Sequence, residues 1–308
     1  MTEENKKLSI IIVNWNVRNL LHKCLRSILR NAPKFPYEIF VVDNDSNDRS
    51  KEMLISAFHK EIEQGLIKTI FNDENLGFAK ANNQALNLAK GEYVLLLNPD
   101  TEIIEENTFE KSVQKFSQNE KTGILGVMLL NSNRTLQPSV RRFPTLSSQT
   151  IILLKLHHFL PLKTLERYFA LDFDYDYEQT CDQVMGAYFM IKREVINQIG
   201  FLDENFWIWF EEVDFCKRAK DKGWEVLYTP DVKIVHHASQ SFKQMLNPRK
   251  QKEFNKSLKL YFKKHKPIWQ YYMICLLHPI SIALSYVVVL FGKWINKKSQ
   301  NPSSKSPA

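Results

Sequence analysis

The sequence lacks several signatures by which proteins of this size are often recognised. None of its four cysteines are spaced as CxxC, so a disulfide framework or a zinc site is not indicated, and reduced structural thiols of a cytosolic protein are expected. No GxGxxG follows any expected strand, which disfavours an NAD-dependent dehydrogenase. The N-terminus MTEENKK leads directly into an expected strand, without the apolar region of a signal peptide.

Negative charge is almost absent from the C-terminal part of the chain. Residues 243–308 carry 13 Lys and Arg but one acid, Glu253, whereas residues 1–242 carry 29 Lys and Arg against 33 Asp and Glu. The net charge of +8 therefore belongs to the C-terminal segment. Because the main body is slightly acidic, a basic groove is not indicated there, and no nucleic-acid partner is expected.

Apolar runs alternate with helical patterns through the first hundred residues. Continuous apolar runs predict buried strands, and the pattern between them predicts helices. The expected strands are 8–13, 38–42, 68–71 and 93–97, and the last helix between them is 77–89. This alternation is typical of βαβ units and a parallel sheet, in which ligands bind at the carboxyl ends of the strands.

The second half of the chain is less regular. Strands are expected at 124–130, 186–191, 226–229 and 233–235, with a helix at 211–222 that ends at Gly223. The stretch 134–180 shows no clear pattern and is interpreted as a variable insertion.

A stretch of 25 residues without a full charge, 268–292, lies between basic segments near the C-terminus. His278 and Pro279 interrupt it, and Pro279 is expected to divide it into two halves, each too short to cross a bilayer. A helical hairpin or interfacial pair on an anionic membrane surface is therefore favoured. A single span and a helical pair buried against the main domain remain as alternatives.

Several polar side chains stand where chemistry is expected. Asp100 follows an apolar strand, where a carboxylate can bind a cation that bridges a diphosphate; capping of the next helix is the alternative. Glu211, Glu212 and Asp214 begin an expected helix among apolar residues that can raise a carboxyl pKa toward that of a general base, although capping acids follow the same pattern.

Two adjacent histidines, His236 and His237, follow the last expected strand. Because neighbouring side chains on a strand point to opposite sides, one of them is expected to face the site and the other to face away.

Six stretches in a fixed order carry a family resemblance. They read LSIIIVNWN, EIFVVDNDSND, NDENLGFAKANNQAL, GEYVLLLNPDTEI, GAYFMIKREVINQIGFLDENFWIWFEEVDFCKRAKDKGW and VKIVHHASQSF, and cover about residues 8–242. The sequence resembles the family 2 glycosyltransferases of GT-A fold, most closely their bacterial rhamnosyltransferase-like branch. The resemblance implies an α/β fold with a nucleotide-sugar-binding sheet flanked by helices. It also implies sugar transfer with inversion at the anomeric carbon.

The resemblance implies a donor pocket at the carboxyl ends of the first strands. Asp43 is expected to hydrogen-bond a pyrimidine base, and the loop with Asn75 and Gly77 to let the backbone approach the nucleotide. The full expected donor-binding set is Asn14, Trp15, Asn16, Asp43, Asn75, Gly77 and Asn98.

The resemblance also implies a metal site for Mg²⁺ or Mn²⁺. Asp100 matches the last acid of the family's DxD motif, and His236 matches the histidine that often completes the site. Asn98 replaces the first acid of that motif, so water and phosphate are expected to hold more of the cation.

The general base is implied at the family's Glu-Asp pair, where this chain has Glu211 and Glu212. Glu212 stands in place of the Asp and is the expected base, with Asp214 as a substitute. Its action on the face opposite the leaving nucleotide gives direct displacement. Arg141 and Arg142 are expected either to bind a phosphate-bearing substrate or to be a solvated loop pair.

Three parts of the chain are expected: a GT-A domain at 1–242, a helical membrane-association segment at 243–298 and a disordered tail at 299–308. The expected donor is a dTDP- or UDP-linked sugar, with rhamnose as the candidate that the branch implies. The expected acceptor is a lipid-linked or growing glycan, and the expected location is the cytoplasmic face of the inner (plasma) membrane. One alternative is a sugar nucleotidyltransferase, although residues 14–16 replace the Gly-rich basic loop that it would need. Another is a non-catalytic carbohydrate-binding or scaffolding protein of the same fold.

Overall fold

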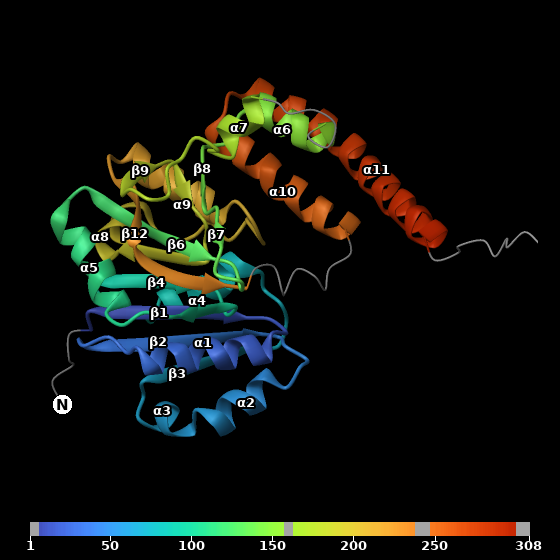
Figure 1. Ribbon diagram of the computed structural model, residues 1–308. Coiled ribbons are helices and arrows are strands. Elements are labelled where there is room, and N and C mark those ends of the chain that lie inside the picture. The colour runs from blue at the N-terminus through green and yellow to red at the C-terminus, as the bar shows by residue number, and fades with distance from the viewer. Residues whose placement is uncertain (1–5, 157–162, 238–246, 300–308) are drawn as a thin grey trace, which may run out of the picture. The chain divides into compact units, whose positions relative to one another are not determined.

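The computed structural model describes residues 6–156, 163–237 and 247–299. The chain forms two compact units. The sheet unit is Met1–Phe143 with Glu166–Gln244, and the helical unit is Pro144–Leu165 with Met245–Ala308 (Figure 1). The expected tail lies outside the described residues from residue 300 onward.

The strands of the sheet unit begin with the four that the apolar runs predicted. In chain order they are β1 Leu8–Asn14, β2 Tyr37–Asn44, β3 Ile67–Asn72, β4 Tyr93–Leu97, β5 Thr101–Ile103, β6 Thr122–Leu130, β7 Leu136–Gln137, β8 Val140–Arg141, β9 Gln179–Cys181, β10 Gln183–Val184, β11 Tyr188–Lys192 and β12 Glu225–His236.

The helices follow the expected pattern in the first half of the chain. In chain order they are α1 Arg18–Arg30, α2 Ser50–Ala57, α3 His59–Glu63, α4 Phe78–Leu86, α5 Thr108–Gln118, α6 Leu146–Leu153, α7 Lys163–Tyr168, α8 Arg193–Ile199, α9 Glu211–Asp221, α10 Asn247–His265 and α11 Ile268–Ser299.

The main sheet runs in the order β3-β2-β1-β4-β11-β6-β12-β5, with β7 beside β6 and β9 beside β12. Strands β3, β2, β1 and β4 are parallel and follow one another upward in Figure 1. Strand β11 is antiparallel to both β4 and β6, and β5 is antiparallel to β12. The sheet is therefore mixed: the expectation of a parallel sheet holds for β3, β2, β1 and β4 and for the pair β6 and β12, but not for β5, β7, β9 and β11.

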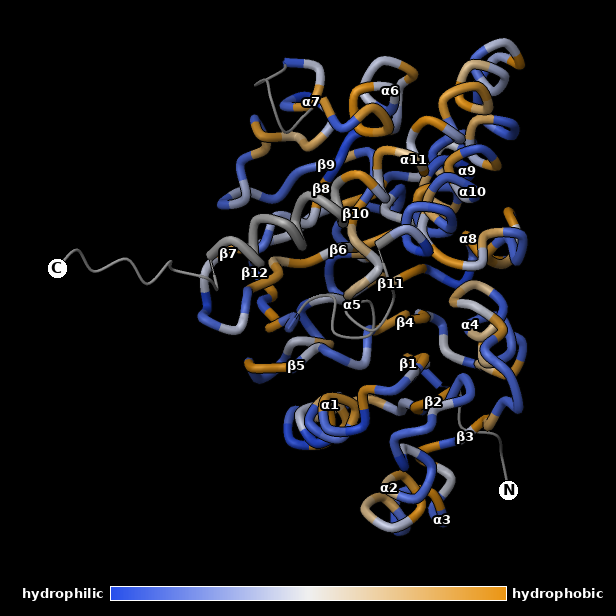
Figure 2. The backbone as a smooth tube through the Cα atoms, turned by 90° about the vertical axis from the view of Figure 1, so that its right-hand side faces the viewer, coloured by the Kyte–Doolittle hydropathy of each residue, from blue (hydrophilic) through white to orange (hydrophobic). Residues whose placement is uncertain are grey.

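The central strands are buried on both faces, which explains their continuous apolar runs. Ile10 and Ile12 of β1 pack with α1, α2 and α5 on one face, and Ile11 and Val13 pack with α4, α8 and α9 on the other. Figure 2 shows hydrophobic residues along β1, β2 and β4. This packing holds the carboxyl ends of the strands in fixed positions.

Strand β12 corrects the expectation of two separate strands at 226–229 and 233–235. It is one strand, Glu225–His236, with a register shift between Thr229 and Lys233 against β6. Pro230 lies inside this irregular part, where a missing ladder hydrogen bond does least harm. The stretch 134–180 contains short elements of both units rather than one insertion.

The helical unit corrects the expectation about Pro279. Helix α11 continues through Pro279 instead of dividing there. A hairpin does exist, but it joins α10 to α11, which pack against each other, and α6 packs on α11. Because neighbouring helices and side chains can satisfy the carbonyl that a proline leaves unbonded, the helix need not break.

Candidate active site

The first group of candidate residues lies where β1 and β2 end side by side. Asn14 and Asp43 are register partners, and the Asn14 amide donates to Asp43 Oδ2 (2.7 Å) and Ser46 Oγ (3.0 Å). Both side chains are buried. Among the described residues, Asn14 Oδ1 has no hydrogen-bond partner, although it is buried. A buried acceptor without a partner is costly, so this atom is suited to a ligand's donor.

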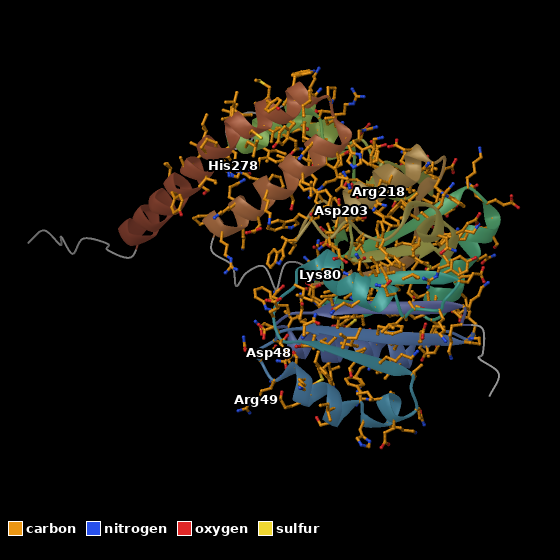
Figure 3. The ribbon with its side chains drawn as sticks, turned by 180° about the vertical axis from the view of Figure 1, so that it is seen from behind. Asp48, Arg49, Lys80, Asp203, Arg218 and His278 are labelled. Carbon is orange, nitrogen blue, oxygen red and sulfur yellow. The ribbon has the colours of Figure 1, made fainter. Side chains whose placement is uncertain are left out.

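The loops after β1 and β2 are tied to each other. The backbone N–H of Asn16 donates to Ser46 Oγ (2.9 Å), and Asn16 Oδ1 accepts from the N–H of Asn47 (2.6 Å). Asp48, labelled in Figure 3, accepts from the N–H of Arg18 at the start of α1 (2.7 Å). Trp15 lies between these hydrogen-bonded residues in the sequence and is half-buried. The loops that are expected to line the nucleotide pocket are therefore held together by their own hydrogen bonds.

The loop that contains Asn75 and Gly77 is held by Asn44, a residue that the sequence analysis did not single out. The Asn44 amide donates to Asn75 Oδ1 (2.9 Å), and Asn44 Oδ1 accepts from the N–H of Leu76 (3.0 Å). Its signal in the sequence was its place at the end of a buried strand, beside Asp43.

Position 77 requires glycine for two reasons: Trp207 lies very close to it, and its backbone φ is positive. Its φ is +84°, and a Cβ there would lie 2.4 Å from Trp207 Cδ1 and 2.5 Å from the Trp207 carbonyl oxygen. The same carbonyl accepts from the N–H of Phe78 (2.7 Å). The expected donor loop is thus packed directly on the segment that precedes Glu211 and Glu212.

The pair proposed from sequence for metal binding is brought together by β5 and β12. His236 is the register partner of Thr101, and the N–H of His237 donates to the carbonyl of Asp100 (2.8 Å). His236 Nε2 lies 3.3 Å from Asp100 Oδ1, and both side chains are buried. His237 points elsewhere, to Glu102 (2.8 Å), as expected for adjacent residues of a strand.

The donor atoms of Asp100 and His236 fit a divalent cation. His236 Nδ1 lies 2.6 Å from Gln137 Oε1, which leaves Nε2 of a neutral ring as the free nitrogen facing the carboxylate. An imidazole nitrogen and a carboxylate oxygen that face each other are a common pair of metal ligands. In the described part of the chain no third His, Cys, Asp or Glu joins them.

Asn98 contributes to this region through its backbone. Its carbonyl accepts from the N–H (3.3 Å) and the hydroxyl (2.7 Å) of Thr101, which forms the tight turn between β4 and β5. The turn aims Asp100, and the Asn98 side chain is half-buried beside it.

Glu211 and Glu212 begin α9 behind two residues of unusual conformation. Trp209 and Phe210 have φ of 61° and 71°, a strained region for aromatic residues. In the part of the chain that the structure describes, one carboxyl oxygen of each glutamate is buried without a hydrogen-bond partner. Strain and unpartnered polar atoms together are typical of a functional site.

Burial changes the acidity of this glutamate pair. It raises the pKa of Glu211 well above its usual 4.5, and the neighbouring charge of Glu212 raises it further. Burial also raises the pKa of Glu212, which the positive charge of Arg141 counteracts. The pKa of both carboxyls is thus raised, and the pair resembles the tuned carboxyls of acid–base catalysis.

Asp214 forms an ion pair with Arg218 instead of joining the glutamate pair. Its side chain is fully buried, and Oδ2 accepts from Arg218 Nε (2.7 Å). Arg218, labelled in Figure 3, also donates to the carbonyls of Ile199 (2.7 Å) and Phe201 (2.9 Å). This ion pair ties α9 to the segment after α8, which is a structural role.

The two arginines of β8 and its neighbourhood differ in their contacts. Arg142 is ion-paired with Asp172 (2.6 Å). Arg141 is exposed and lies over the Phe169 ring, with its guanidinium carbon 5.4 Å from the ring centroid. Its register partner is Gln183 of β10, and β10 packs on α9. The positive charge of Arg141 acts on Glu212 at the start of α9, where it counteracts the raised pKa of that carboxyl.

With this geometry established, comparison with known proteins identifies the family. Residues 9–200 match the family described as "Glycosyl transferase family 2". The chain belongs to this family. The resemblance inferred from the six motifs is thereby confirmed, and the protein is a glycosyltransferase.

Relatives and solved structures agree with this assignment. This glycosyltransferase is 22% identical over 248 residues to the N-acetylglucosaminyl-diphospho-decaprenol L-rhamnosyltransferase of Mycobacterium tuberculosis, which covers 76% of this chain and 77% of the relative.

Two solved structures show the same fold. A mannosyltransferase from Pyrobaculum calidifontis, solved with GDP-Man and Mn²⁺, has a TM-score of 0.57 at 14% identity and covers 94% of this chain and 76% of its own. GalNAc-T7, solved with UDP, GalNAc and Mn²⁺, has a TM-score of 0.56 at 20% identity and covers 75% of this chain and 43% of its own. The expected GT-A fold is confirmed.

Proposed function

We propose that this inverting family 2 glycosyltransferase uses Glu212 to activate an acceptor hydroxyl and takes its sugar from a dTDP- or UDP-linked donor. The observation that carries the proposal is the glutamate pair at the start of α9, in which one oxygen of each carboxyl is buried and has no partner among the described residues. The loop before this pair packs on Gly77 of the expected donor loop. Base and donor are therefore expected to act at one place.

The reaction follows from the acidity of the pair. Glu212 accepts the proton of the acceptor hydroxyl, while burial and the charge of Glu212 raise the pKa of Glu211 and oppose its ionisation. The hydroxyl oxygen then displaces the nucleoside diphosphate from the opposite face of the anomeric carbon. One displacement gives inversion.

Donor binding is assigned to the preformed loops after β1 and β2. Asp43 and Asn14 provide buried acceptors for the polar edge of the base, and Trp15 provides an aromatic surface. Asp100 and His236 would hold Mg²⁺ or Mn²⁺. When bound, such a cation offsets the negative charge that develops on the departing diphosphate.

The acceptor is proposed to carry a phosphate near the reacting sugar, with rhamnose as one candidate for the transferred sugar. Arg141 supports this, because it is exposed and its charge acts on Glu212, whereas Arg142 is already paired with Asp172. A guanidinium binds phosphate through well-oriented donors. The name of the Mycobacterium tuberculosis relative gives a diphospho-lipid acceptor and a rhamnosyl product.

The helical unit is proposed to bind a membrane surface. The apolar face of α11 consists of exposed residues that recur at helical spacing: Trp269, Tyr272, Met273, Leu276 and Ile280. The window Ile268–Val287 is long and apolar enough to span a bilayer, yet only 17% of it is buried. An exposed apolar face of this length is suited to hydrocarbon rather than to water.

An interfacial position of α11 is favoured over a transmembrane one. Helix α10 packs along α11, and the Asn255 amide donates to the carbonyl of His278 (3.4 Å) in the middle of the apolar run. Lys252 and Lys256 of α10, which are close to Asn255 in the sequence, are exposed. A spanning α11 would carry these lysines into the bilayer core, which is costly, whereas at an interface they meet anionic headgroups. The cytoplasmic face of the plasma membrane is the proposed location.

The proposed donor can be tested by thermal shift. Purified protein is heated with Mn²⁺ and each of dTDP-rhamnose, UDP-N-acetylglucosamine and GDP-mannose, and transfer to a diphospho-lipid acceptor is then measured with the best binder. A native-state ligand at 100 times its Kd stabilises the protein by about 2.7 kcal/mol. A shift with the dTDP- or UDP-linked sugar supports the proposal. Stabilisation by GDP-mannose alone would contradict it.

A further inference from the structure

Gln137 is a buried polar residue beside the proposed metal ligands, on the short strand β7. Its side chain makes hydrogen bonds at both ends. Oε1 lies 2.6 Å from His236 Nδ1, and Nε2 donates to Asn131 Oδ1 (2.9 Å) and to the His236 carbonyl (3.4 Å). A side chain in this position can determine which ring nitrogen of His236 carries the proton.

The orientation of the Gln137 amide follows from a chain of donors and acceptors that starts at a backbone carbonyl. The carbonyl of Leu136 can only accept, so the Asn131 atom 3.2 Å from it is the amino group. The other atom of that amide, Asn131 Oδ1, must then accept, and Gln137 Nε2 donates to it. Gln137 Oε1 is therefore the atom that faces His236.

This orientation determines which nitrogen of a neutral His236 carries the proton. Because Gln137 Oε1 can only accept, Nδ1 must donate to it, and Nε2 keeps its lone pair. That lone pair lies 3.3 Å from Asp100 Oδ1. Two electron-rich atoms at this distance leave a place for a cation rather than for a hydrogen bond of their own.

We propose that Gln137 is a positioning residue that holds His236 in its Nδ1-protonated tautomer, so that Nε2 and the Asp100 carboxylate are both free to bind a divalent cation. The inference rests on the metal site of the proposed function. It assigns a role to a side chain 99 residues away from its partner, on a strand that carries no motif of the family resemblance.

Without the acceptor oxygen of Gln137, a second neutral tautomer becomes accessible to His236. The ring can carry its proton on Nε2 and donate it to Asp100 Oδ1, which closes the site with an internal hydrogen bond. A cation must then compete with that bond. Loss of such an outer partner typically weakens metal binding by about 10- to 100-fold.

The first test compares Gln137→Met with Gln183→Met. Gln183 is a matched control, since it is also buried on a short strand and donates to a backbone carbonyl, that of Arg142 (2.9 Å). Mn²⁺ affinity is measured on the full-length protein by electron paramagnetic resonance with UDP present. Gln137→Met should weaken Mn²⁺ binding by about 10- to 100-fold. Gln183→Met should leave it within about threefold, even if its melting temperature falls equally.

His236→Ala separates failure of this inference from failure of the metal site. If His236→Ala weakens Mn²⁺ binding and Gln137→Met does not, the role of Gln137 is refuted and the metal site stands. If His236→Ala has no effect, the metal site is wrong and the inference is overturned with it.

A second measurement does not depend on a folded variant at Gln137. Nitrogen-15 labelling of histidine distinguishes the two neutral tautomers by their ring nitrogen shifts, and His236→Ala identifies the signal. The wild-type protein without metal, at a pH where the ring is neutral, should show His236 protonated at Nδ1. A wild-type signal protonated at Nε2 would overturn the proposal.

Discussion

The two units of this glycosyltransferase differ in the apolar side chains that their elements expose. In the sheet unit, the central strands are apolar and buried on both faces. In the helical unit, Asn255, Ser281 and Ser285 are buried, while Trp269 and Leu276 of the apolar face are exposed. Figure 3 labels His278 on the same helix.

The difference concerns one face of α11. Burial of apolar side chains is favourable in water, and both units bury some: the sheet unit along its strands, and the helical unit at Leu258 and Ile274. The face of α11 with Trp269 and Leu276 is left exposed, and such a face is suited to hydrocarbon, which is the reason for proposing a membrane contact.

The largest expected effect separates the chemistry of the sheet unit from the membrane contact. Glu212→Gln should lower kcat by about 100-fold or more, because the hydroxyl loses its base, with little change in donor affinity. Transfer assays and vesicle flotation are run on the same preparation, and flotation should not change. Near wild-type turnover of Glu212→Gln together with loss in Asp214→Asn would instead make Asp214 the base.

Removal of the metal or of its proposed ligands should affect sugar transfer and donor affinity in the sheet unit, but not membrane binding by the helical unit. Chelation with excess EDTA should abolish transfer, and Asp100→Ala should weaken donor affinity along with rate, by about 10-fold or more. His236→Ala should reduce transfer more than His237→Ala, since His237 is turned toward Glu102. Full activity in EDTA would remove the cation from the mechanism.

The reciprocal effect is expected in the helical unit. Leu276→Glu should reduce partition onto anionic phosphatidylglycerol vesicles by roughly 30-fold, since a buried leucine contributes about 2 kcal/mol. Donor hydrolysis should be unchanged. Leu88→Glu is the matched control, because Leu88 is 55% exposed on the sheet unit and Leu276 is 64% exposed. Equal partition of the two variants would refute the membrane face.

The smallest effect concerns the buried carboxyl of Glu211 in the sheet unit. The pKa of Glu211 is raised above 4.5 in the folded protein, so the folded state binds more protons than the unfolded state above that pH. Stability therefore falls as the pH rises from about 4.5 toward the raised pKa. Glu211→Gln removes this loss and should raise stability at pH 8, by about 1.4 kcal/mol for each tenfold change in proton affinity.

Thermal unfolding from pH 5 to pH 8 measures this effect. Glu120→Gln, at an exposed glutamate, should follow the wild-type curve. If Glu211→Gln were less stable than the wild type at pH 8, the buried carboxyl would be stabilising rather than costly.

Many residues of the candidate site could be chosen from the sequence because they follow buried strands directly. The runs that became β1, β2 and β4 are apolar on both faces, and Asp43 and Asp100 stand at or just beyond their ends. The glutamates of α9 were visible as acids in an apolar segment. In contrast, Asp214 has the same composition around it, and only its contact with Arg218 shows its structural role.

Other features depended on partners that are distant in the chain. The two expected strands around Pro230 are one strand because β6 pairs with it on both sides of the bulge. Pro279 does not end α11, since the continuous helix packs on α10 and α6. Local sequence describes a residue's own preference, and packing with distant elements overrides it.

The sequence alone determined the family, the central strands and the identity of the acids, because these depend on local apolar runs and on motif residues. Only the tertiary structure decided the state of each group. Gln137 meets His236 across 99 residues, and Trp207 meets Gly77 across 130. The pKa of a carboxyl, the tautomer proposed for His236 and the orientation of a side chain depend on such distant neighbours and on burial. The residues that adjoin a side chain in the sequence do not determine either of these.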